Sequence, residues 1–126
     1  MKTATQPAEL IYEALEAWGE TNDLPISDRR CFAAESKLES AVIAALEAIP
    51  GVDAVEAKIG SAGSRYFECF NDSAGVSITF RVSNHKSGRR GNENAGVVVL
   101  GESAEEIDRQ LARAAEAMAQ EIADAE

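Results

Sequence analysis

Apolar residues recur at two different spacings along the chain, and the change of spacing separates helical from strand-forming segments. Over residues 7–18 they recur every three or four positions, the spacing of one buried helix face. The same spacing returns over residues 28–49, where Ser27 suits the N-cap and a Pro-Gly pair suits the end. It returns a third time after Ser103, which opens a capping-box sequence. The pattern therefore predicts three helices.

Between the second and third helices the period changes to two. Residues 76–83 alternate apolar and polar side chains and form the clearest strand in the chain. Strands are also predicted over residues 55–59, 65–70 and 97–100, and short glycine-bearing turns separate the first three strands. We expect one α+β domain, residues 1–126, in the order α-α-β-β-β-β-α, with an antiparallel sheet and helices packed on one face.

Two segments lie outside these elements. Residues 1–6 show no apolar periodicity, so we expect them to be flexible. Residues 84–94 are polar, basic and rich in glycine, which is typical of a mobile loop. Neither an apolar membrane span nor a secretory signal is recognisable, and the two cysteines form no C-x-x-C motif. The sequence thus favours a cytoplasmic protein without membrane contact.

Charge narrows the choice of partner. The chain holds 22 acidic and 12 basic residues, a net charge of −10. Both ends are acidic, whereas residues 59–101 carry more basic than acidic side chains. An acidic field repels free nucleic acid and attracts basic surfaces, so direct nucleic-acid binding by the whole domain is disfavoured.

The first predicted helix carries the most informative charge pattern. Glu9, Glu13, Glu16 and Glu20 are spaced 4, 3 and 4 residues apart. At 100° per residue they fall within about 60° of one another, away from the apolar side. The helix dipole favours Glu9 but fades beyond the first turn, so an ordinary solvated face explains the later glutamates less well. The alternative is a row of carboxylates presented to lysines and arginines of a partner.

A second candidate surface is basic. His85, Lys86, Arg89 and Arg90 fall within the glycine-rich loop, and such a loop is able to bind phosphate. Arg65 and Arg81 are expected to add to it on the exposed face of the sheet. This pattern supports an alternative function as a nucleic-acid-binding module, although three cations at a loop tip are also common in soluble hairpins.

Catalytic patterns are scarce. His85 is the only histidine, and Cys31 and Cys69 lie in apolar stretches typical of packed thiols. No phosphate-binding glycine motif, metal-ligand spacing or calcium loop is present. We expect a protein that is not an enzyme and needs no cofactor or metal, with a small enzyme centred on His85 as the remaining alternative.

Two features suggest a family resemblance. The strand end Arg81-Val82-Ser83-Asn84-His85 resembles that of small proteins of phages and mobile elements. The small, acidic, single-domain profile is also similar to that of phage anti-CRISPR and anti-restriction proteins. The likeness implies an inhibitor that covers a nucleic-acid site on a host complex, and it assigns no residue a role.

These observations favour a non-enzymatic acidic inhibitor or adaptor. It would bind a basic protein that handles nucleic acid, such as a nuclease or a ribonucleoprotein, through Glu9, Glu13, Glu16 and Glu20, in partial imitation of phosphates. A second copy of the chain is a further candidate partner, because the strand over residues 97–100 offers an edge for pairing.

Overall fold

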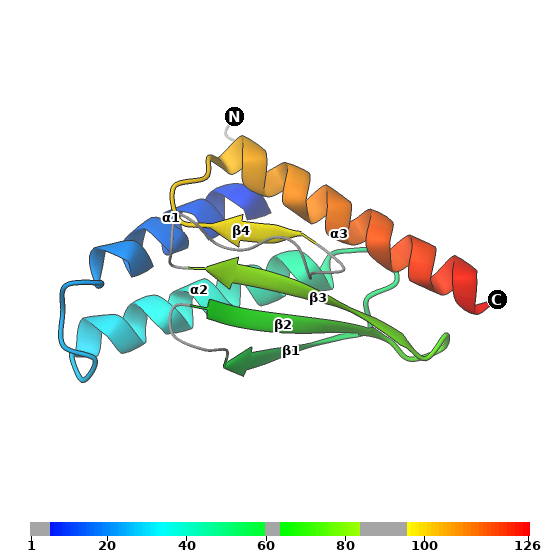
Figure 1. Cartoon of the computed structure of the whole chain (residues 1–126), viewed down its shortest axis with the longest axis horizontal. Helices are drawn as coiled ribbons and strands as arrows, with labels where there is room; N and C mark the ends of the chain where they lie inside the picture. Colours follow the sequence, from blue (N-terminus) through cyan, green and yellow to red (C-terminus); the bar gives the residue numbers. More distant parts are fainter. Residues whose placement is uncertain (1–5, 60–63, 84–95) are drawn as a thin grey trace, which may run out of the picture.

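The computed structural model describes residues 6–59, 64–83 and 96–126 and confirms the predicted order of elements (Figure 1). Three helices and four strands follow one another as α-α-β-β-β-β-α. Their bounds are α1 (Pro7–Glu20), α2 (Arg29–Glu47), β1 (Ala54–Ile59), β2 (Ser64–Asn71), β3 (Val76–Ser83), β4 (Val97–Val99) and α3 (Ala104–Ala125).

Side-chain caps set the starts of the two longer helices. The Ser103 hydroxyl accepts a hydrogen bond from the Glu106 backbone N–H at 3.1 Å, which confirms the predicted start of α3. The predicted N-cap of α2 was wrong by one residue. Asp28, not Ser27, caps this helix, and its Oδ1 accepts from the Arg30 backbone N–H at 2.9 Å. A carboxylate also suits the positive end of the helix dipole.

The strands form one sheet in the order β1-β2-β3-β4. The first three strands are antiparallel neighbours, as predicted. The prediction of a wholly antiparallel sheet was wrong, because β4 runs parallel to β3. Parallel strands need a connection of about a dozen residues or more, and residues 84–95 supply that length. A continuous apolar run such as β4 is typical of a strand buried on both faces, as parallel strands usually are, but a run this short does not distinguish the two directions.

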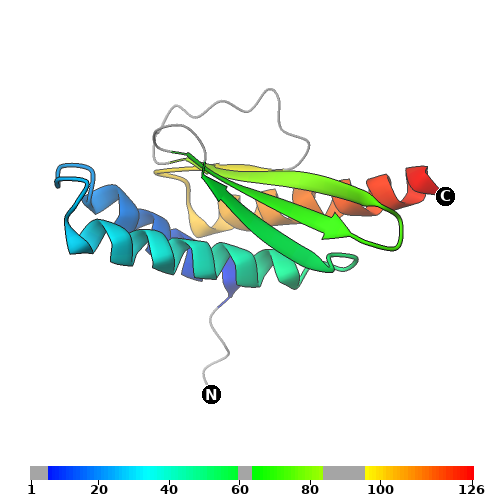
Figure 2. The same ribbon diagram turned by 90° about the horizontal axis from the view of Figure 1, so that it is seen from below.

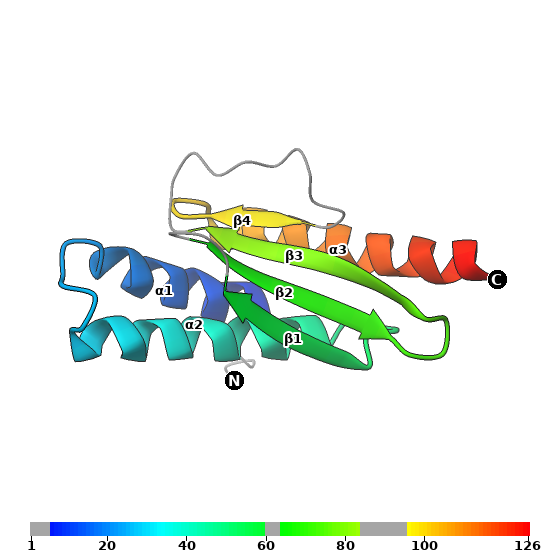
Figure 3. The same cartoon turned by 60° about the horizontal axis from the view of Figure 1, so that its bottom comes forward.

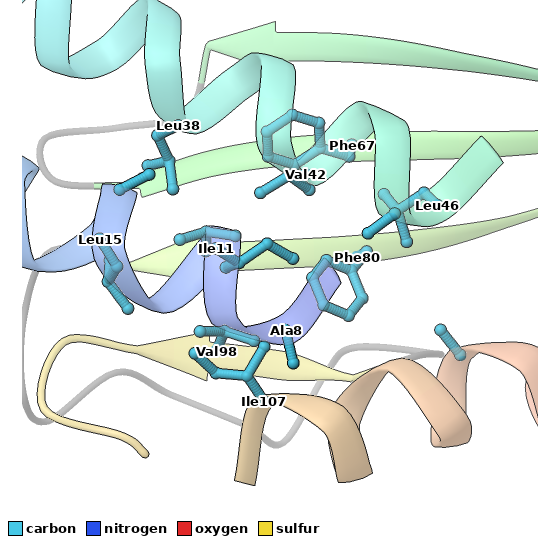
Figure 4. Close-up of a cluster of buried hydrophobic side chains, with 14 of the residues drawn as sticks. Ala8, Ile11, Leu15, Leu38, Val42, Leu46, Phe67, Phe80, Val98 and Ile107 are labelled. Carbon is cyan, nitrogen blue, oxygen red and sulfur yellow. The ribbon is translucent and has the colours of Figure 1, made fainter. Parts of the chain in front are cut away.

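All three helices lie on one face of the sheet (Figure 2), as predicted. The inward side chains of the strands join the buried faces of the helices in one core (Figure 4). Alternation along the strands produces this arrangement, since every second residue points to the helices. The largest fully buried side chains include Ile11, Leu15, Leu38, Phe67 and Phe80. Among the helices of the described ranges, none has the length and apolar character needed to cross a bilayer.

The side chain of Gln110 forms a hydrogen bond with the backbone at the outer edge of β4. The Gly96 carbonyl accepts from the Arg81 N–H of β3 at 3.3 Å. The C=O and N–H of one peptide unit point in opposite directions, so the Val97 N–H points away from β3. Gln110 Oε1 accepts this N–H at 3.3 Å, and the Gln110 side chain donates in turn to Glu106 Oε2 at 3.0 Å. Helix α3 thus covers the β4 edge and supplies an acceptor for its outward Val97 N–H.

Candidate functional site

The four glutamates predicted to form a row do so on α1, and we call them the acidic row: Glu9, Glu13, Glu16 and Glu20. The opposite side of α1 carries the buried residues that enter the core, among them Ile11, Leu15 and Trp18. Three members of the row are exposed and Glu16 is half-buried. The row therefore faces solvent, outward from the helix layer.

The first member of the row has a structural partner. Glu9 Oε1 accepts a hydrogen bond from the Gln6 backbone N–H at 3.1 Å. This contact satisfies a donor at the N-terminus of α1, and the carboxylate also lies at the favourable end of the helix dipole. Gln6, the last residue of the segment that was expected to be flexible, is the N-cap of the helix, and residues 1–5 lie outside the described residues.

The remaining members of the row have no such partner. Within residues 6–59, 64–83 and 96–126, Glu13, Glu16 and Glu20 form no hydrogen bond or ion pair through their carboxylates. Helix α3 differs, because Arg109 pairs with Glu106 one turn away. Like charges spaced i, i+4 destabilise a helix by about 0.2–0.5 kcal/mol per pair, and no cation on α1 offsets that cost.

Exposed apolar side chains lie on both sides of the acidic row. Leu10 is 43% exposed and Tyr12 is 37% exposed. Ala17 of α1 contacts the hollow between α1 and α2, and at 100° per residue Leu10 lies on the same flank of the helix. Tyr12 falls on the other flank of the acidic row. Aromatic and apolar anchors surrounded by charges are typical of protein-binding surfaces. The outer face of α1 therefore offers contact area as well as charge.

A hollow lies where the end of α1 meets the start of α2. It has a volume of about 400 Å³, and alanines and Leu24 line much of it. Glu20 lines it together with Arg30 and Lys37 of α2. Arg30 is already paired with Asp28, at 2.9 Å between Nη2 and Oδ2. Sequence reasoning missed this juxtaposition, because only the packing of α2 against α1 brings the two cations beside the row.

The structure separates the two arginines that were expected to share the exposed face of the sheet. Residues opposite one another in adjacent strands point to the same face, and Arg81 lies opposite Tyr66 while Arg65 lies opposite Val82. Arg65 therefore points toward the helices and Arg81 toward the open face. The expectation of one shared basic face was wrong, and no sequence pattern shows this before the register of the strands is known.

Each arginine has a distinct environment. The Arg65 side chain is 13% exposed, and its Nη2 lies 2.5 Å from Glu35 Oε1 of α2. Its Nε lies 3.5 Å from Glu39 Oε2, so it links the sheet to α2. The Arg81 guanidinium lies 5.8 Å from the centroid of the Tyr66 ring, within the range of a cation–π contact.

His85, Lys86, Arg89 and Arg90 lie outside the described residues. The nucleic-acid-binding loop and the enzyme centred on His85 therefore stay predictions from the sequence.

The thiols are buried. Burial raises the pKa of the Cys69 thiol to about 12, so the group is a thiol, not a thiolate, at neutral pH. Cys31 is buried as well, with its Sγ 3.4 Å from the Pro25 carbonyl oxygen. In the part of the chain that the structure describes, no three His, Cys, Asp or Glu side chains are grouped to hold a metal ion.

No protein family model, curated protein or solved structure matches the chain. The acidic row, with Leu10 and Tyr12 beside it, is the feature of the described surface that best combines exposure, unpaired charge and contact area.

Proposed function

We propose that the protein is a non-catalytic inhibitor or adaptor that binds a basic, nucleic-acid-handling protein through the outer face of α1. The observation that carries this proposal is the exposed acidic row, three of whose carboxylates have no partner within the described residues. Such carboxylates gain most from a partner that supplies lysine and arginine, because charge-assisted hydrogen bonds are stronger than neutral ones.

The spacing of the row supports partial imitation of a phosphate backbone. Eleven residues separate Glu9 from Glu20, which corresponds to about 16 Å of helix at 1.5 Å per residue. Four carboxylates over that length give one charge per 5–6 Å, roughly, against about one per 3.4 Å along a single DNA strand. The charge density is lower than that of DNA but of the same order. This mode of action is the one implied by the resemblance to anti-CRISPR and anti-restriction proteins.

The test is affinity capture from the natural host with matched charge variants. The row variant is Glu13→Lys/Glu16→Lys, and the control is Asp108→Lys/Glu116→Lys on the exposed surface of α3, with the same change of net charge. We expect wild type and control to retain the same basic protein and the row variant to bind it about tenfold to a hundredfold more weakly. Double-stranded DNA added to the eluate should compete with the wild type for that protein.

Two results would contradict the proposal. Equal binding by row variant and control would show that overall charge, and not the acidic row, governs the interaction. A captured protein that binds DNA and the wild type simultaneously, without competition, would exclude imitation of phosphates. The salt dependence gives an independent readout, since the row variant should lose part of the slope of log K against log salt.

A further inference from the structure

Within residues 6–59, 64–83 and 96–126, no strand pairs with the outer edge of β1. Strand β1 pairs with β2 on one side, and its other side lies at the border of the sheet (Figure 3). Ala54, Glu56, Ala57 and Lys58 are all exposed. The opposite border differs, because the valines of β4 are buried and Gln110 accepts the outward N–H of Val97. An uncovered edge presents unpaired backbone N–H and C=O groups to another strand.

The charges on β1 are only partly balanced within the chain. Lys58 Nζ lies 2.6 Å from Glu68 Oε1 on β2, and Glu68 Oε2 also accepts from the Ser77 hydroxyl at 3.0 Å. These two hydrogen bonds lower the pKa of the Glu68 carboxyl. Glu56 lies directly opposite Glu68, an unfavourable cross-strand pair, and among the described residues its carboxylate forms no hydrogen bond or ion pair. The pKa of Lys58 is raised mainly by its hydrogen bond to Glu68 and to a smaller extent by the charge of Glu56.

We propose that a second copy of this chain is the partner of the β1 edge, paired antiparallel and centred on Ala57. A twofold axis perpendicular to the sheet leaves each side chain on the same face of the joined sheet as before. Residues that lie opposite one another across the axis must therefore be both even-numbered or both odd-numbered. A pair centred on Glu56 opposes two glutamates, and one centred on Lys58 opposes two lysines. A pair centred on Ala57 places Glu56 of each copy opposite Lys58 of the other.

In this register Glu56 gains an opposite charge, and Lys58 gains a second one in addition to Glu68. Each Lys58 lies between Glu68 of its own chain and Glu56 of the second copy, and the twofold symmetry gives each of the two Glu56 carboxylates one opposite lysine. The residue on the axis is small and exposed on the helix side, where a large side chain would meet its own copy. The two sheets join into one continuous sheet, and the open edges disappear.

The helix layer beside β1 also exposes apolar surface. Phe32 is 59% exposed and lies on the side of α2 that carries Glu35 and Glu39. Those two glutamates bind Arg65, whose strand is paired with β1. A second copy at β1 brings its own helix layer beside this flank. The acidic row lies on another helix, so the pairing goes beyond the proposed function and leaves the row exposed in both copies.

The first test is a charge exchange followed by sedimentation. We expect the wild type to sediment as a dimer of 13.4 kDa chains. Glu56→Lys opposes lysine to lysine and Lys58→Glu opposes glutamate to glutamate, so each variant alone should raise the dimer dissociation constant about tenfold or more. An equimolar mixture of the two variants restores both opposite-charge pairs and should dimerise like the wild type. Far-UV circular dichroism checks that each variant is folded.

The second test reads the register through a disulfide. Opposed residues of an antiparallel pair have Cα atoms about 4.5–5.5 Å apart, within the range that a disulfide spans. Ala57→Cys should therefore crosslink to a covalent dimer under mild oxidation. Ala119→Cys, exposed on α3, is the control and should crosslink far more slowly, while both native cysteines are buried.

The proposal is overturned by a wild type that stays monomeric at every concentration reached. It is equally overturned if mixing the charge variants restores nothing, or if Ala57→Cys crosslinks no faster than the control. None of these outcomes bears on capture through the acidic row, so failure of the dimer and failure of the proposed function are distinguishable.

Discussion

Replacement of Gln110 by methionine should destabilise the protein by removing one hydrogen-bond acceptor at the β4 edge. Gln110 is 2% exposed, and its Oε1 accepts the Val97 N–H at 3.3 Å. Methionine has a similar volume and a flexible chain, so it fills the site without a cavity. Gln110→Met leaves the buried Val97 N–H without a partner and also removes the half-buried donor to Glu106 Oε2. The first loss is the more costly, because that N–H is buried.

The size of the effect follows from the cost of that donor. A buried polar group that loses its partner costs about 1–3 kcal/mol. Unfolding of 126 residues at about 2.1 cal/mol/K per residue gives an entropy near 0.26 kcal/mol/K. Each kcal/mol then lowers Tm by about 4 °C, so we expect Gln110→Met to lower Tm by roughly 4–12 °C.

Urea unfolding followed by far-UV circular dichroism measures the change in the free energy of unfolding. Gln120→Met on the exposed surface of α3 is the control and should stay within about 0.5 kcal/mol of wild type. Amide exchange at Val97 gives a local readout and should become faster in Gln110→Met. A loss below about 0.5 kcal/mol with unchanged exchange at Val97 would refute the assigned role of Gln110.

Two further predictions concern the ends of helices and the start of β4. Hydrogen bonds from Arg30 lower the pKa of the Asp28 carboxyl to about 2, from a value near 3.8 in the unfolded chain. The ionised carboxylate therefore stabilises the folded protein above about pH 4, and this contribution is lost as the pH falls toward 2. Urea unfolding of wild type and Asp28→Ala at several pH values should therefore show a difference at pH 6 that shrinks as the pH falls to 2, and a difference independent of pH would contradict it. A Cβ added at Gly96 lies 2.6 Å from the backbone oxygen of Gln110, which is closer than two such atoms can approach. Gly96→Ala should therefore lower the free energy of unfolding, measured by thermal denaturation, by about 1–3 kcal/mol. A variant as stable as the wild type would show that α3 and β4 are able to move apart.

The elements that the sequence predicts well are those encoded within one segment. Alternation over residues 76–83 and helical spacing over residues 7–18 each give a period, and a period determines which side chains face the core. The acidic row belongs to this class, since the geometry of one helix is enough to align its members. The structure accordingly places all four on the outer side of α1.

The features that the sequence did not reveal depend on contacts between segments. The direction of β4 depends on its pairing with β3, and the separation of Arg65 from Arg81 depends on strand register. Gln110 did leave a signal, because it interrupts the apolar stripe of α3 three residues after Ile107. A lone polar residue within a buried stripe usually has a specific hydrogen-bond partner, and here the partner is the edge of β4.

Contacts of the acidic row with other parts of the molecule indicate which of its members form the centre of the proposed binding surface. Glu9 is used at the N-terminus of α1. Glu20 lines the hollow together with Lys37 of α2, whose positive charge lowers the local negative potential, while Arg30 beside it is already paired with Asp28. Glu13 and Glu16 lie between these ends. Within the described residues their carboxylates form no hydrogen bond or ion pair, and neither lines the hollow that holds the cations of α2. A basic partner therefore gains most at these two positions, so the charge-reversal test is directed at them rather than at the whole row.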